Sequence, residues 1–150
     1  MRILAALVLT VLAGCAPAPP PAEQPRTDLT AADWYAPTIE QLAALNSEAE
    51  QMMKAGRYDE ASAAIVKGHP LQSRLLEALQ PTLAAMTAVA DLDDLYGRML
   101  LHNKQYGWAR SMFQKNVTRW KHWKPESPET KQRLRVAMSQ VSECDRRLAE

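Results

Sequence analysis

Apolar residues recur at spacings of three and four from residue 37 onward, which is the pattern of amphipathic α-helices. Each apolar stripe covers about a third of its helix, so every helix needs a neighbour that buries the stripe. The sequence therefore predicts an all-α fold. The expected helical segments are 37–55, 58–67, 71–79, 83–100, 106–124 and 128–148.

Glycines, prolines and a capping residue mark where these helices are expected to begin or end. Gly56 ends the first segment as the residue that follows the helix. Gly68 and Pro70 are expected to stop the second, because a proline inside a helix removes a backbone N–H. Pro81 breaks the chain before the fourth segment, and Ser127 is expected to cap the last helix.

The last predicted helix has an apolar stripe that we expect to face the core. The stripe consists of Leu134, Ala137, Met138, Val141, Cys144 and Leu148. Within it, Cys144 is expected to be buried as a small apolar side chain. The alternative for this thiol is an intermolecular disulfide in an oxidising compartment.

Composition agrees with a helical fold and excludes several other classes. The 150 residues suit a single domain, with 24 alanines, only 5 glycines and no runs of β-branched residues. Most other residues are strong helix formers, which excludes an all-β fold and disfavours a parallel α/β sheet. Only 2 cysteines are present, which excludes a disulfide scaffold and a cysteine-rich zinc module.

The first residues have the pattern of a secretory signal. Arg2 supplies a positive charge, and the apolar stretch 3–13 is interrupted only by Thr10. Eleven helical residues reach about 16 Å, roughly half of the hydrocarbon core of a bilayer. The stretch is therefore expected to direct secretion rather than to span a membrane.

The residues that follow resemble the lipobox of bacterial lipoproteins, Leu12-Ala13-Gly14-Cys15. The resemblance implies that residues 1–14 are a lipoprotein signal peptide and that Cys15 is acylated on its thiol and its new amine. Several acyl chains anchor a protein stably to a membrane. Ala16 stands where an aspartate would retain a Gram-negative lipoprotein in the inner membrane, which implies the outer membrane, facing the periplasm. The alternative is an ordinary secretory signal with a chance cysteine.

Residues 15–35 are expected to be the lipidated cysteine and a proline-rich tether. Five prolines between positions 17 and 25 favour an extended polyproline II chain over helix or sheet. At about 3.1 Å per residue, residues 16–30 would reach on the order of 45 Å. The alternative is a ligand for a proline-recognition domain. Residues 36–150 are expected to form the helical domain.

Two helix junctions match each other at an offset of 48 residues, with residues 54–61 aligned on 102–109. Small residues allow two antiparallel helices to approach closely, and an aromatic residue fills the turn between them. The pattern therefore predicts antiparallel helical hairpins. The matching pairs are Ala49 with Gly97, Tyr58 with Tyr106, Ala61 with Ala109, and Ile65 with Phe113.

This pattern resembles the tetratricopeptide repeat, whose signature it follows at Tyr96-Gly97, Tyr106, Ala109 and Phe113. The resemblance implies about two repeats, extra helical residues between them and a capping helix at the C-terminal end. The offset departs from the usual repeat length of about 34, and the terminal proline of the repeat is missing. Lys104 replaces the turn glycine, although the neighbouring Asn103 tolerates left-handed geometry. The alternative is a generic helical bundle.

In the repeat family, the first helix of each pair lines a groove that binds a peptide or helix of a partner. Carried over by register, the resemblance implies the partner-binding candidates Asn46, Glu50, Met53, Asp94, Arg98 and His102. Trp120 continues the apolar stripe of its helix and is expected in the core. Trp123, near the end of that helix, is the better candidate for an exposed anchor.

The sequence has no recognisable enzymatic site. Its 3 histidines lie in separate segments, so no metal and no cofactor is predicted. It has no nucleophile elbow, phosphate-binding glycine loop or dinucleotide fingerprint. Asp91, Asp93 and Asp94 lack the glycine and final glutamate of a calcium loop, and we expect a solvated acidic helix face there.

Charge is divided unevenly along the chain. Residues 15–100 carry 6 Lys and Arg against 12 Asp and Glu, a net charge of −6. Residues 101–150 carry 11 against 5, a net charge of +6. The basic part suits an anionic partner surface, or it balances the acidic part within one monomer or across a homodimer. A periplasmic location disfavours nucleic acid.

Together these features predict a non-enzymatic lipoprotein, held in the outer membrane by lipid on Cys15, that binds an envelope protein or peptide in its helical groove. In fold and location it resembles pilotins and the assembly factors of pili, secretion systems and barrel insertion. The alternatives are a structural lipoprotein that self-associates through its opposite charges and an enzyme that acts on peptidoglycan through an unfamiliar site.

Overall fold

The computed structural model describes residues 28–150, which contain a short 3₁₀-helix, five α-helices and no strand. The predicted all-α fold is therefore confirmed. The predicted signal peptide, Cys15 and most of the tether lie outside the described residues. Within residues 28–150, no helix has both the length and the apolar character that crossing a membrane requires. The elements are η1 (Leu29–Ala31), α1 (Tyr35–Lys54), α2 (Tyr58–Leu75), α3 (Leu83–His102), α4 (Tyr106–His122) and α5 (Pro128–Ala149).

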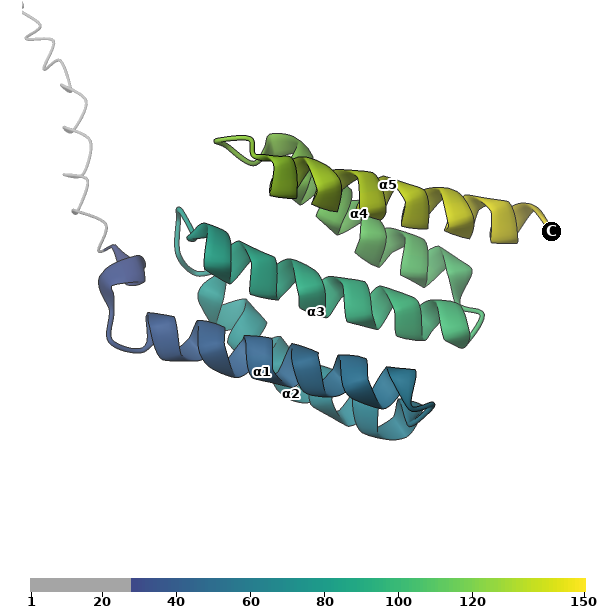
Figure 1. Ribbon diagram of the computed structural model, residues 1–150, viewed down its shortest axis with the longest axis horizontal. Helices are drawn as coiled ribbons and strands as arrows, with labels where there is room; N and C mark the ends of the chain where they lie inside the picture. Colours follow the sequence, from purple (N-terminus) through teal and green to yellow (C-terminus); the bar gives the residue numbers. More distant parts are fainter. Residues whose placement is uncertain (1–27) are drawn as a thin grey trace, which may run out of the picture.

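The helices form antiparallel hairpins, as the sequence predicts. α1 packs against α2, α3 packs against α4, and α5 packs against α4. α3 also contacts both helices of the first hairpin, which joins the two hairpins. Figure 1 shows α1, α3 and α5 running in the same direction along the molecule, with α2 and α4 running in the opposite direction.

The two hairpin turns have the same backbone geometry at the predicted offset of 48 residues. Gly56 has φ 74° and Lys104 has φ 60°, so both lie in the left-handed region. The Gly56 N–H donates to the Met53 carbonyl at 3.1 Å, and the Lys104 N–H donates to the Leu101 carbonyl at 3.0 Å. The left-handed residue of the second turn is therefore Lys104 itself rather than Asn103, whose φ is −80°.

α2 continues past the position where the sequence predicts its end. The helix includes Pro70 and ends at Leu75. The separate helix predicted over 71–79 is therefore wrong, since its first part belongs to α2 and residues 76–82 form the connection to α3.

Close packing accounts for this continuation. A Cβ placed on Gly68 would lie 2.9 Å from a methyl carbon of Leu92 and 3.1 Å from one of Leu42, so α2 approaches both α1 and α3 at this point. Leu75, at the end of the helix, is fully buried. Burial of both ends of the segment outweighs the backbone hydrogen bond that Pro70 removes, because tertiary packing contributes more to helix stability than intrinsic propensity.

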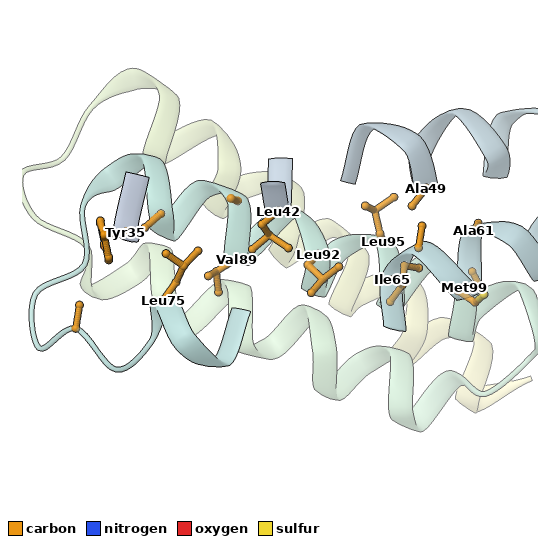
Figure 2. Packing of buried hydrophobic residues seen from close by; sticks show 14 residues of the cluster. Tyr35, Leu42, Ala49, Ala61, Ile65, Leu75, Val89, Leu92, Leu95 and Met99 are labelled. Carbon is orange, nitrogen blue, oxygen red and sulfur yellow. The ribbon is translucent and has the colours of Figure 1, made fainter. Parts of the chain in front are cut away.

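The core lies mainly between the first hairpin and α3 (Figure 2), and a second cluster joins α3, α4 and α5. The small and bulky residues that the repeat pattern places between helices are buried on both sides. They are Ala49, Ala61 and Ile65 in the first copy, and Gly97, Ala109 and Phe113 in the second.

α5 begins as predicted, but only two of the six residues in its apolar stripe are buried. The Ser127 hydroxyl accepts a hydrogen bond from the Thr130 N–H, and the Thr130 hydroxyl accepts one from the Ser127 N–H. Ala137 and Cys144 are buried, as expected. Met138 and Leu148 are 53% and 55% exposed, so their predicted burial is wrong. The reason is that α5 is the last helix and packs extensively only on α4.

The expected solvated acidic face of α3 is wrong at Asp93, which is 5% exposed. Its carboxylate accepts hydrogen bonds from Gln72 of α2 at 3.0 Å and from Arg119 of α4 at 2.9 Å. One buried carboxylate thus joins three helices. Arg133 of α5 likewise lies 2.7 Å from Asp91, so acidic and basic parts of the sequence pair within one chain at both positions.

Candidate functional site

Three of the predicted partner-binding residues meet between α1 and α3. The Arg98 guanidinium on α3 donates to the Glu50 carboxylate on α1. Its Nε lies 3.1 Å from Oδ2 of Asp94, which precedes it by one helical turn. Glu50 is also 3.2 Å from Lys54 Nζ. Glu50 and Arg98, both predicted from the repeat register, are therefore in contact although 48 residues separate them in the sequence.

A hollow of about 310 Å³ lies beside this cluster, between α1 and α3. Asn46 in its wall is 6% exposed, and its Nδ2 donates to the Ala88 carbonyl at 2.8 Å, which ties α1 to α3. The Asn46 Oδ1 is buried without a hydrogen-bond partner among the described residues. A buried acceptor without a partner costs free energy. The lining residues are Ala43, Asn46, Ser47, Glu50, Asp91, Asp94 and Leu95.

A second hollow of about 200 Å³ lies between α3 and α5. It adjoins the first, because Asp91 and Asp94 line both. On its α5 side, Arg133 pairs with Asp91 and Gln140 donates to the Asp94 carboxylate. The two hollows together form one surface across three helices, which we call the α1/α3/α5 groove.

Glu50 and Asp94, two carboxyl groups of the groove, have pKa values shifted in opposite directions. The hydrogen bond from Arg98 lowers the pKa of Glu50. Desolvation raises the pKa of Asp94, and the neighbouring charges of Asp91 and Glu50 add to this effect. The pKa of Asp94 is raised although Gln140 and Arg98 both stabilise its charged form.

The remaining predicted candidates lie outside the two hollows. Met53 is partly buried and packs against the main core cluster. His102 is exposed and stacks on Tyr58 with ring centroids 3.7 Å apart, at the end of the bundle where both hairpins turn. Trp123 is partly buried and lies edge-on to Trp120, with ring centroids 6.2 Å apart. Trp120 itself is buried, as expected.

Sequence reasoning missed Asp91, Arg133 and Gln140 as groove residues. Asp91, Asp94 and Arg98 follow one another at spacings of three and four, which places them on one face of α3. That spacing was a usable signal for Asp91. The two α5 residues had no such signal, because no repeat register relates α5 to α1 or α3.

Residues 28–150 contain no group of three or more His, Cys, Asp or Glu side chains arranged to hold a metal ion. The groove therefore offers hydrogen-bond acceptors and a shape rather than a metal centre. No protein-family model matches the chain, and no curated protein and no solved structure is significantly similar to it.

Proposed function

We propose that this protein is a lipid-anchored, tetratricopeptide-repeat-like scaffold of the bacterial envelope that binds a protein segment in the α1/α3/α5 groove. The observation that carries the proposal is one surface that α1, α3 and α5 build around the carboxylates of Glu50, Asp91 and Asp94. Such a surface binds an extended segment by shape and hydrogen bonding, with no reaction. This is the role of a pilotin-like assembly factor.

The lipobox supports the location. Acylation of Cys15 would hold the chain at the outer membrane, and the proline-rich residues that follow would give the helical domain reach into the periplasm. A scaffold attached in this way meets its partners at the membrane surface, where envelope complexes assemble.

The chemistry of the groove favours a basic partner segment. Its walls carry the carboxylates of Glu50, Asp91 and Asp94. A lysine or arginine side chain supplies several N–H donors and a positive charge. Such a group would stabilise the charged form of Asp94.

Lipidation is tested with labelled palmitate in a bacterial host that processes lipoproteins. The wild-type chain is expected to incorporate label and to fractionate with the outer membrane. Cys15→Ser is expected to incorporate none and to leave the membrane fraction. Membrane attachment of Cys15→Ser equal to that of wild type would contradict lipid anchoring.

Groove binding is tested with a photo-crosslinking amino acid at Ala43, an exposed residue in the wall of the first hollow. We expect a discrete crosslink to an envelope protein in intact cells. Ser47→Arg fills the hollow with a positive charge and is expected to abolish that crosslink. The matched control is Ser142→Arg, at an exposed α5 position outside both hollows, which is expected to preserve it. Equal crosslinking in the two variants would contradict groove binding.

A further inference from the structure

A larger cleft, of about 660 Å³, lies along α4 and shares no residue with the α1/α3/α5 groove. One wall is a face of α4 from Gly107 to Arg119, and Leu76 and Met86 also line it. Because α3 and α4 are antiparallel, Met86 near the start of α3 lies toward the end of α4. We call this the α4 cleft.

The charged groups that line the α4 cleft are all cationic. They are Arg110, Lys115 and Arg119, and no carboxylate belongs to the lining. Arg119 donates a hydrogen bond to Asp93, and Arg110 Nε donates one to Asp145 at 2.5 Å. Each guanidinium keeps further N–H groups for another acceptor. Lys115 makes no ion pair within residues 28–150.

The first turn of α4 adds unsatisfied backbone donors at one end of the cleft. Gln105 precedes the helix without a side-chain capping bond, and the first turn contains no acidic residue. At the equivalent positions of the first hairpin, α2 has Asp59 and Glu60. Gly107 stands where α2 has Asp59, and a Cβ placed on it would meet nothing within 4 Å. The positive end of α4 is therefore open to an external negative charge.

At the other end of the cleft, two apolar side chains line it together with Arg119. Leu76 is 47% exposed, and Met86 is partly buried. From Gly107 to Thr118, the wall of α4 runs about 16 Å at 1.5 Å per residue. About five residues of extended chain cover that length. One short segment can therefore reach both the cationic end and the two apolar side chains.

We infer that the α4 cleft binds a short acidic segment of a partner protein, with carboxylates over Gly107, Arg110 and Lys115 and an apolar side chain against Leu76 and Met86. The complementarity of charge argues for this occupant, since every charged side chain in the lining of the cleft is cationic. A basic segment suits the α1/α3/α5 groove instead. The molecule would then hold two partners of opposite charge on separate surfaces, as an adaptor does.

The test uses the full chain with Cys15→Ser in a non-ionic detergent. The probe is a fluorescein-labelled peptide of eight residues with glutamates at one end and leucines at the other, followed by fluorescence anisotropy. A second peptide has lysine in place of each glutamate and measures any binding through the leucines alone. We expect the acidic peptide to bind at least tenfold more tightly, and its affinity to fall as salt rises.

Two variants locate the binding site. Gly107→Glu places a negative charge in open space at the cationic end, and Lys115→Glu reverses an exposed charge; each is expected to weaken binding at least tenfold. Gly107→Ala is the matched control and is expected to bind as wild type. Ser47→Arg in the groove is expected to leave this binding unchanged, so failure of the groove proposal and failure of this one are distinguishable.

The inference is overturned if the acidic peptide does not bind, if the lysine peptide binds equally well, or if Gly107→Glu has no effect. Binding of lipid vesicles would identify a different occupant. If vesicles of phosphatidylethanolamine and phosphatidylglycerol bind the chain and compete with the peptide, and Gly107→Glu abolishes that binding too, the cleft binds lipid headgroups and the inference is wrong.

Discussion

Gly97 and Gly107 lie on neighbouring helices, and a methyl group at each would meet very different surroundings. At Gly97 the added Cβ would lie 2.5 Å from Cε1 of Phe113, whereas at Gly107 it would meet nothing within 4 Å. Alanine gains up to about 1 kcal/mol over glycine in a helix, and overpacking a core costs about 1–3 kcal/mol.

We therefore expect Gly97→Ala to lower the free energy of unfolding by about 1–2 kcal/mol, because the overpacking outweighs the gain in helix propensity. Gly107→Ala is expected to keep it or to raise it by up to about 1 kcal/mol. Urea unfolding followed by circular dichroism at 222 nm measures both. Equal stability of the two variants would show that α3 and α4 are not in close contact at Gly97.

Arg98 contacts two carboxyl groups whose pKa shifts have opposite consequences for stability. Glu50 has a lowered pKa, so its contribution is present above pH 4.5 and is lost as the pH falls through the folded-state value. Asp94 has a raised pKa, so its charged form costs stability as the pH rises from 3.8 through the folded-state value. The two effects partly cancel at neutral pH.

Replacing Arg98 by methionine is expected to raise the pKa of both carboxyl groups. Glu50 loses the hydrogen bond that lowers its pKa, and Asp94 loses a neighbouring positive charge. NMR titration of the side-chain carboxyl carbons measures each group separately. Unchanged pKa values in Arg98→Met would mean that the guanidinium does not bridge α1 and α3 in solution.

At the scale of the element, hydrophobic periodicity predicts four of the five α-helices well and misplaces the end of α2. Stripes at helical spacing locate α1, α3, α4 and α5, because each is bounded by a turn residue or a cap that acts locally. α2 is different. Its local signals, Gly68 and Pro70, indicate an end, yet the helix continues to Leu75 because packing against α1 and α3 stabilises it.

Because α2 continues past Pro70, this proline leaves one backbone hydrogen bond of the helix unmade. Alanine at this position supplies an N–H that can donate to the Val66 carbonyl, four residues earlier. We expect Pro70→Ala to raise the free energy of unfolding by about 1–3 kcal/mol, part of the cost of a proline inside a helix.

The control for this prediction is Pro37→Ala. Pro37 lies in the first turn of α1, where the N–H has no helical partner, so its replacement is expected to change stability by less than about 0.5 kcal/mol. Urea unfolding compares the two variants directly. A loss of stability in Pro70→Ala would mean that the ring of Pro70 itself packs favourably.

At the scale of the whole molecule, Asp93 and Arg119 connect three helices through one buried ion pair. Their side chains are 7% and 12% exposed, and Gln72 of α2 donates to the same carboxylate. Removing one partner of such a pair leaves the other charge buried and uncompensated, at a cost of about 3–5 kcal/mol.

Asp93→Ala is therefore expected to lower the free energy of unfolding by about 3–5 kcal/mol. The double variant Asp93→Ala with Arg119→Met is expected to recover most of this loss, because no unpaired charge remains buried. A double-mutant cycle by urea unfolding measures the coupling. Additive losses in the cycle would show that the two side chains do not interact.

Features that depend on residues near one another in the sequence could be predicted, whereas features that depend on distant residues could not. The positions of α1, α3, α4 and α5, the left-handed turn at Gly56 and the close approach at Gly97 follow from residues near one another in the chain, and sequence alone determined them. The groove and the α4 cleft required the tertiary structure. Arg133 meets Asp91 from 42 residues away, and no helical period relates two such positions.

The same distinction applies to burial. The sequence determined that α3 is apolar on one side and that α5 has an apolar stripe, since both follow from spacing. It did not determine that Asp93 is enclosed by three helices or that Met138 faces solvent. Those outcomes depend on how many neighbours a helix has. α3 packs on α1, α2 and α4, whereas α5 packs extensively on a single helix, and only the assembled fold decides the number of neighbours.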